Sequence, residues 1–233
     1  MSKRETLGLS PGFMEALTTT IVEPNPVLIE YYHKAKEFEM KEMLVSKVGD
    51  GEWLYIQSNI DQNIFLLNKL EDLGLIPDSG KVCDCGIGLG TAIFDIYLQS
   101  KDLGKKYSFV GIEKQSKYVD YLNESLIGFW NDDLEIISGD LMDQRYDEYD
   151  VVYCYTPFKD VKKLREFYLK VISEMHEGAI LIENKNWGLG EGKILSSISE
   201  NGHLSILESS NHYEIVPIDL DGITVFQKKS VSK

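Results

Sequence analysis

An acidic residue followed by three alternating glycines, Asp84, Gly86, Gly88 and Gly90, is the part of this sequence with the clearest chemical meaning. The residues before Gly86 are mostly apolar and predict a short buried strand, and those after Gly90 predict a helix. Glycine has no Cβ and accepts positive φ angles, so such a turn lets the backbone approach a ligand closely. The first turn of the helix adds free N–H groups and a partial positive charge. These residues therefore predict a ligand-binding turn.

The glycine spacing restricts the kind of ligand. The dinucleotide fingerprint G-x-G-x-x-G would require a glycine at position 91, but that residue is Thr91. The observed order is G-x-G-x-G, and Asp84 stands two residues before the first glycine. A carboxylate at this place suits an ammonium group and repels a pyrophosphate. A nicotinamide-dependent dehydrogenase is therefore the less favoured alternative.

The stretch resembles the first motif of class I S-adenosylmethionine-dependent methyltransferases, in which an apolar strand leads to an acid, one further residue and G-x-G-x-G. The resemblance implies that the cofactor is S-adenosyl-L-methionine. It implies that Gly86, Gly88 and Gly90 line the methionine end of that cofactor. Asp84 would hold its ammonium group, directly or through water.

Two further acids end apolar runs in the same way. Glu113 ends the run 107–113 and lies 23 positions after Gly90. In nucleotide-binding α/β folds, the acid that accepts hydrogen bonds from the ribose hydroxyls is expected about 20 residues after the glycine-rich turn. Asp140 follows the run beginning at Leu134. The resemblance implies that Asp140 accepts the adenine amino group and that Leu141 offers a backbone N–H.

The substrate end of the pocket is expected after the run 149–155, where the chain reads Tyr155-Thr156-Pro157-Phe158. Amino-group methyltransferases carry Asn/Asp-Pro-Pro-Tyr/Phe here, and this sequence keeps only the second proline and the aromatic residue. Tyr155, Thr156 and Phe158 are the catalytic candidates, and Tyr155 also a cofactor contact. Phe158 either stacks on a planar target or packs in the core. The four scattered histidines suggest no general base.

Strands and helices alternate along the chain, which predicts an α/β doubly wound sheet. The last two strands are separated by a turn-like segment that contains Asp221-Gly222, which predicts an antiparallel hairpin. We therefore expect a mostly parallel seven-stranded sheet that ends in this hairpin. The predicted helices cover residues 92–99, 116–129 and 161–175, and the predicted strands 82–85, 107–113, 134–138, 149–155, 178–183, 212–217 and 222–227.

The chain divides into a helical N-terminal extension or lid, residues 1–58, and a Rossmann-like domain, residues 59–233. Apolar residues predict a helix over residues 26–45. Tyr55 and Gln57 precede a predicted helix at residues 60–73, and we expect them to contact cofactor or substrate because lids of this kind exclude water. The alternative is that the extension only packs on the edge of the sheet.

Net charge, apolar runs and cysteine positions indicate which partners and which cell compartment to expect. The net charge of −14 disfavours a nucleic-acid substrate, although Lys159, Lys162, Lys163 and Arg165 form a weak basic cluster that fits either a phosphate or a solvated helix face. The sequence shows no apolar run long enough for a membrane span and no secretory signal. The three cysteines, Cys83, Cys85 and Cys154, lie in predicted strands, which favours small buried residues over disulfides or a metal site. We expect a cytoplasmic protein without a metal.

Two classes of function follow from these observations. The first is an S-adenosylmethionine-dependent methyltransferase that acts on a protein side chain or a small molecule. The second is a non-catalytic S-adenosylmethionine-binding module, such as a regulatory subunit or sensor, which the altered motif at residues 155–158 favours slightly. The complete set of acids and glycines weighs against the second class.

Overall fold

The protein is described here from a computed structural model. The structure describes residues 25–45, 66–155, 157–158, 160–184, 213–216 and 223–229. Predictions for Tyr55, Gln57, Thr156 and Lys159 lie outside these residues. In the described part of the chain, no helix is both long enough and apolar enough to cross a membrane.

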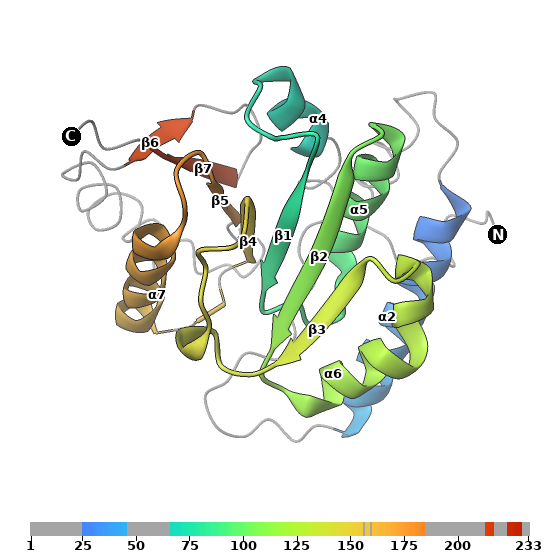
Figure 1. Cartoon of the computed structure of the whole chain (residues 1–233). Coiled ribbons are helices and arrows are strands. Elements are labelled where there is room, and N and C mark those ends of the chain that lie inside the picture. Colours follow the sequence, from blue (N-terminus) through green and yellow to red (C-terminus); the bar gives the residue numbers. More distant parts are fainter. Residues whose placement is uncertain are drawn as a thin grey trace.

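One sheet runs through the centre of the molecule (Figure 1). Within the described residues it has seven strands in the order β3-β2-β1-β4-β5-β7-β6. Neighbouring strands from β3 to β5 are parallel, and β7 is antiparallel to both β5 and β6. The prediction of a mostly parallel α/β sheet with a closing antiparallel pair is therefore confirmed. The strands are β1 (Ser79–Cys85), β2 (Lys106–Glu113), β3 (Leu134–Ser138), β4 (Val151–Tyr155), β5 (Ile180–Asn184), β6 (Tyr213–Val216) and β7 (Ile223–Lys228).

Helices cover both faces of the sheet. One face packs against a core that includes residues of α2 (Pro26–Val45), α4 (Leu66–Asp72), α5 (Thr91–Asp102) and α6 (Ser116–Tyr121). The other face packs against α7 (Val161–Glu174) and the short 3-10 helix η4 (Leu141–Asp143). Successive side chains of a strand point to opposite faces. In β1, Val82 therefore joins the α5 core, whereas Cys83 and Cys85 join the α7 core.

The predicted single helix over residues 116–129 is wrong in its second half. Helix α6 ends at Tyr121, and the chain continues as a π-helical turn, η2 (Leu122–Leu126), and a 3-10 turn, η3 (Ile127–Trp130). Asn131 then ends the segment with a left-handed φ of 47°. The changes of helix type bring Leu122, Leu126 and Trp130 into the core, where all three are fully buried. Burial of these large side chains outweighs regular helical geometry.

The strand order reverses direction beside β1, because β2 lies on one side of it and β4 on the other. Ligands of open α/β sheets bind in the crevice outside the carboxyl ends of the strands at such a switch point. The glycine-rich turn leaves β1 at this place. The fold therefore brings the predicted site residues at the ends of β1, β2, β3 and β4 to one edge.

Candidate functional site

The glycine-rich turn is anchored to the end of β2. The backbone N–H groups of Gly86 and Ile87 both donate to the carbonyl of Ile112, at 2.9 and 3.1 Å. Gly86, Gly88 and Gly90 have φ angles of 82°, 55° and 67°. A side chain at any of these left-handed positions would be strained, which explains why the turn uses glycine. Gly90 is also the N-cap residue of α5.

Glu113, at the end of β2, binds the backbone of the turn. Its Oε2 accepts a hydrogen bond of 3.0 Å from the N–H of Gly88, and its Oε1 accepts one of 2.8 Å from the N–H of Gln115. The side chain is only 8% exposed. A carboxylate has about four acceptor positions, so one such side chain can accept more than two hydrogen bonds. A ribose contact through Glu113 stays a prediction.

Asp84 lies in β1 between Gly111 of β2 and Tyr153 of β4. Its side chain is 4% exposed, and no donor among the described residues hydrogen-bonds its carboxylate. Burial raises the pKa of Asp84 well above its usual range, and the neighbouring carboxylate of Glu113 acts in the same direction. A buried carboxylate without donors is costly. A cationic group bound beside it would favour the ionised form.

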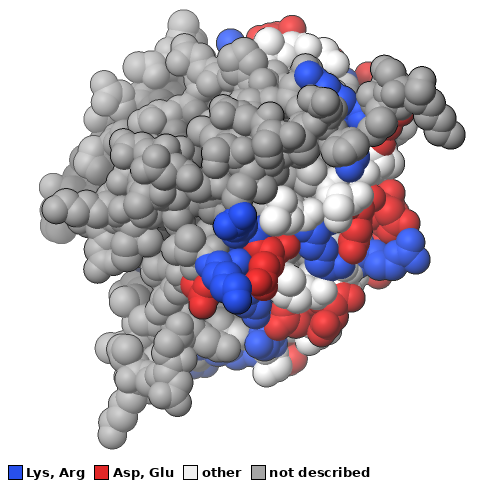
Figure 2. Space-filling view, turned by 90° about the vertical axis from the view of Figure 1, so that its left-hand side faces the viewer, with Lys and Arg blue, Asp and Glu red and all other residues white. Residues whose placement is uncertain are grey.

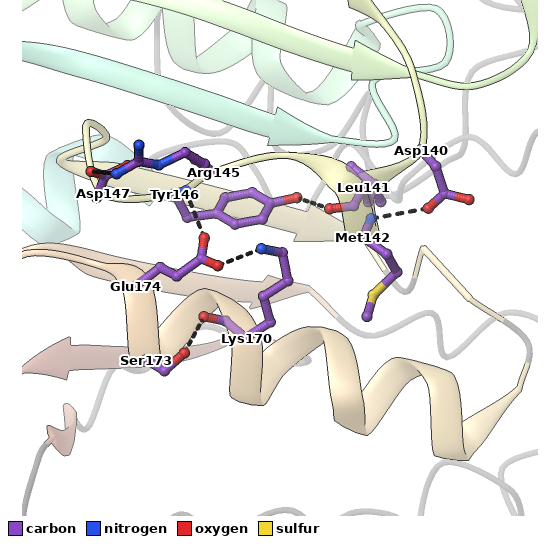
Figure 3. A network of polar contacts seen from close by, with 9 residues as sticks. All are labelled: Asp140, Leu141, Met142, Arg145, Tyr146, Asp147, Lys170, Ser173 and Glu174. Carbon is purple, nitrogen blue, oxygen red and sulfur yellow. Dashed lines mark hydrogen bonds and ion pairs between the residues drawn. The ribbon is translucent and has the colours of Figure 1, made fainter.

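Asp140 caps the 3-10 helix η4 beside the same edge. Its Oδ1 accepts a hydrogen bond of 2.9 Å from the N–H of Met142, as Figure 3 shows. Its Oδ2 lies 3.4 Å from Lys114 Nζ and 3.7 Å from Lys163 Nζ. The hydrogen bond from Met142 lowers the pKa of Asp140, and the two lysines add to this effect. Asp140 is therefore ionised at neutral pH.

Tyr146, a buried tyrosine that the sequence analysis missed, binds the backbone next to Asp140. The hydroxyl of Tyr146 donates to the carbonyl of Leu141 at 2.8 Å, and the N–H of Tyr146 donates to Glu174 Oε2 at 3.1 Å (Figure 3). Glu174 also pairs with Lys170 one turn earlier in α7. The contacts connect the Leu141 backbone to α7. No local pattern marks Tyr146, because its partner Glu174 on α7 lies 28 positions away in the sequence.

The residues after β4 divide between the two cores. Tyr155 ends β4 and is half-buried. Phe158 packs against α7. Its ring centroid lies 5.5 Å from that of Phe167, and Lys163 Nζ lies 4.4 Å from the centroid of the Phe158 ring. The ring is thus a partly buried member of the α7 core. This arrangement favours the packing interpretation of Phe158 over stacking on a substrate.

The α7 side carries charges of both signs, and Figure 2 views the molecule from there. Lys162 lies 4.0 Å from Glu166, and Lys170 pairs with Glu174. Lys163 lies beside Asp140. Two basic residues of the cluster, Lys162 and Lys163, therefore lie beside acids, which is typical of a solvated helix surface.

The cysteines are buried, as the sequence predicts. Cys83 and Cys85 have sulfur atoms 3.9 Å apart, and Cys154 is the register partner of Cys85 on β4. All three are free thiols. Across the described ranges there is no group of three or more His, Cys, Asp and Glu side chains that could hold a metal ion.

The edge thus combines a glycine-rich turn with three carboxylates from β1, β2 and the loop after β3. Asp84 and Glu113 are buried, whereas Asp140 is partly exposed. Such a set favours a ligand with a cationic group and several hydrogen-bond donors. It repels the pyrophosphate of a dinucleotide.

Comparisons with known proteins identify the fold. No protein-family model matches the sequence, and no curated protein matches it significantly. Solved structures do match. Cofactor-bound Rv0187 from MTB has a TM-score of 0.62 at 15% identity, covering 95% of this chain and 99% of that chain.

Two other similar solved structures are of proteins described as methyltransferases. The SAH-bound methyltransferase PaMTH1 of Podospora anserina has a TM-score of 0.62 at 12% identity, covering 99% of this chain and 98% of that one. A protein of Listeria monocytogenes assigned to the class I S-adenosylmethionine-dependent methyltransferases has a TM-score of 0.55 at 13% identity, covering 87% and 70%. This chain therefore has the fold of the class I S-adenosylmethionine-dependent methyltransferases.

Proposed function

We propose that this protein binds S-adenosyl-L-methionine at the carboxyl edge of β1 and transfers its methyl group to a protein side chain or a small molecule. The observation that carries the proposal is the buried carboxylate of Asp84 beside the glycine-rich turn, with no donor from the described residues. The ammonium group of the cofactor would supply both the charge and the donors that Asp84 lacks. The SAH-bound state of the Podospora anserina methyltransferase with the same fold supports this choice of ligand.

Each site residue has a distinct part in this proposal. Asp84 holds the ammonium group, and the turn at Gly86 and Gly88 lets the backbone lie against the methionine portion. Glu113 accepts hydrogen bonds from the ribose hydroxyls in addition to its bond from the N–H of Gly88. Asp140 accepts the adenine amino group, and the Leu141 N–H faces the adenine ring.

When bound, S-adenosylmethionine supplies an activated methyl group, which a nucleophile displaces as the sulfur–carbon bond breaks. The chain contributes mainly by holding the two partners in line at short distance. Tyr155 stands at the end of β4, next to the turn, and is the described residue proposed to border the methyl acceptor. The net charge of −14 favours a small-molecule or protein acceptor over a nucleic acid.

The proposal is tested by calorimetric titration of S-adenosylmethionine and S-adenosylhomocysteine into the wild type and Asp84→Asn. This substitution keeps the size of the side chain and removes its charge. We expect micromolar binding to the wild type and at least about a tenfold loss in the variant, as for a charge-assisted hydrogen bond.

A matched control is Asp95→Asn, which removes another buried carboxylate, one that lies on α5 and contacts Gln99. It should bind both ligands like the wild type. Failure of the folded wild type to bind either ligand would refute the proposed cofactor. Binding without methyl transfer to any acceptor in a labelled-methyl screen would instead support the non-catalytic module.

A further inference from the structure

Helix α2 of the N-terminal extension packs directly against the helix that begins at the glycine-rich turn. Its buried side chains are Leu28, Tyr31, Tyr32 and Ala35, which recur at helical spacing and form one face. Figure 1 shows α2 beside α5 and α6, on the same side of the sheet. The apolar face of α2 thus reaches the part of the core that lies under the turn.

Two tyrosine hydroxyls from α2 bind backbone carbonyls where the turn joins α5. Tyr31 donates to the carbonyl of Leu89 at 2.8 Å, and Tyr32 donates to the carbonyl of Thr91 at 2.9 Å. The two carbonyls belong to the residues on either side of Gly90. All of these contacts are buried. The pair of hydroxyls therefore holds both neighbours of one left-handed glycine.

The Tyr31 ring is itself firmly placed. It stacks on Phe94 of α5 with a centroid distance of 3.9 Å and an interplanar angle of 12°. A Cβ added to Gly90 would lie 2.8 Å from the Tyr31 hydroxyl oxygen, which shows how closely the two approach. Both the side chain and the turn therefore have little freedom to move relative to each other.

The turn needs such support because three of its five residues are glycines with positive φ angles. Glycine has more backbone freedom to lose than any other residue. The buried carbonyl of Leu89 also requires a donor, and Tyr31 supplies it. Without these hydroxyls the turn could take other conformations, in which its N–H groups point elsewhere.

We propose that Tyr31 and Tyr32 are positioning residues for the cofactor, because their hydroxyls fix the glycine-rich turn in its binding conformation. The proposal rests on the proposed function for the identity of the ligand. It makes α2 part of the cofactor site, and it goes beyond a role of the extension as a lid or as a cover for the edge of the sheet.

The chain offers a matched control in the same interface. The hydroxyl of Tyr121 donates to the carbonyl of Lys34 in α2 at 2.9 Å, and its ring stacks on Phe38 at 4.1 Å. Tyr121→Phe therefore removes one hydroxyl bond between α2 and its support without touching the turn. Tyr31→Phe and Tyr32→Phe remove the bonds to the carbonyls on either side of Gly90 and keep the aromatic rings.

The first measurement is hydrogen exchange of the amides of Gly88 and Gly90, followed by NMR in the protein without ligand. Both amides are hydrogen-bonded, to Glu113 and to Ile87, so their exchange reports opening of the turn. We expect exchange about tenfold faster in Tyr31→Phe and Tyr32→Phe, as for loss of one buried hydrogen bond. In Tyr121→Phe the two amides should exchange at the wild-type rate.

The second measurement is the Kd for S-adenosylhomocysteine in the same proteins. A turn that is less often in its binding conformation raises the apparent Kd in proportion. We expect weaker binding by up to about tenfold in the two turn variants and wild-type binding in Tyr121→Phe. Unchanged exchange in the turn variants, or faster exchange with unchanged affinity, would overturn the proposal, as would equal effects in Tyr121→Phe.

The two measurements separate this inference from the proposed function. If the wild type binds no S-adenosylhomocysteine, the proposed function fails and with it the cofactor role of the two tyrosines. The exchange experiment needs no ligand and still decides whether their hydroxyls hold the turn.

Discussion

We predict that the free energy of unfolding depends on pH through the titration of Asp95. The side chain lies on α5 and is 6% exposed, and its Oδ2 has no hydrogen-bond partner among the described residues. Burial raises the pKa of Asp95 from 3.8 to about 7, and a hydrogen bond from Gln99 opposes this rise. Gln99 Oε1 already accepts from the N–H of Leu67 at 3.0 Å, so its amide nitrogen is the group that reaches Asp95.

The sign of the pH effect follows from the raised pKa. The folded protein binds the Asp95 proton more tightly than the unfolded chain does. The protonated carboxyl therefore favours folding at low pH, and this contribution is lost as the pH rises from about 4 to about 7. The difference between the two pKa values corresponds to about 4 kcal/mol at most.

Asp95→Asn removes the titration and keeps the shape of the side chain. We expect the free energy of unfolding of the variant, relative to the wild type, to increase by several kcal/mol, up to about 4, between pH 4 and pH 8. Urea unfolding followed by tryptophan fluorescence measures both proteins across this range. A difference in the free energy of unfolding that stays constant with pH would refute the argument.

A second variant tests the role of the hydrogen bond. Gln99→Met removes the group that lowers the pKa of Asp95, so the loss of stability should be centred at a higher pH than in the wild type. Its overall stability also falls because Leu67 N loses its acceptor. The comparison therefore uses the pH of the transition and not the absolute free energy. A transition at the same or a lower pH would contradict this assignment.

Two further predictions concern the supports of the site. Gly111→Ala should destabilise the protein by about 1–3 kcal/mol in urea unfolding, because the new Cβ would lie 2.3 Å from Ile87 Cδ1 in the glycine-rich turn. Gly128→Ala is the control: a Cβ there would have nothing within 4 Å, so the free energy of unfolding should not change. Tyr146→Phe removes the donor to the Leu141 carbonyl and should lower the free energy of unfolding by about 1 kcal/mol or more and weaken S-adenosylhomocysteine binding, as measured by calorimetry. Wild-type stability in either Gly111→Ala or Tyr146→Phe would contradict the packing described for that residue.

Much of the fold follows from local patterns in the sequence. The apolar strand, the glycine spacing and the helix after Gly90 are properties of neighbouring residues, and together they predict β1, the turn and α5. The apolar spacing over residues 26–45 predicts the same range that α2 occupies. Glu113 ends β2 and Asp140 follows β3, so the parallel order of the sheet is enough to bring them to the edge that carries Asp84.

The remaining features depend on which surfaces meet in the folded chain. The bonds from Tyr31 and Tyr32 to the turn connect residues 58 and 59 positions apart, and Tyr146 reaches α7 across a separation of 28. Phe158 occupies the aromatic position of the motif that contacts substrate in amino-group methyltransferases, but its ring packs against α7. Spacing along the chain predicted most of the helices, the strands and the edge where the candidate site lies, because these depend on local patterns of residues. Tertiary packing alone decided which distant side chains support that edge, because hydrogen bonds and burial between distant segments leave no periodic pattern in the sequence.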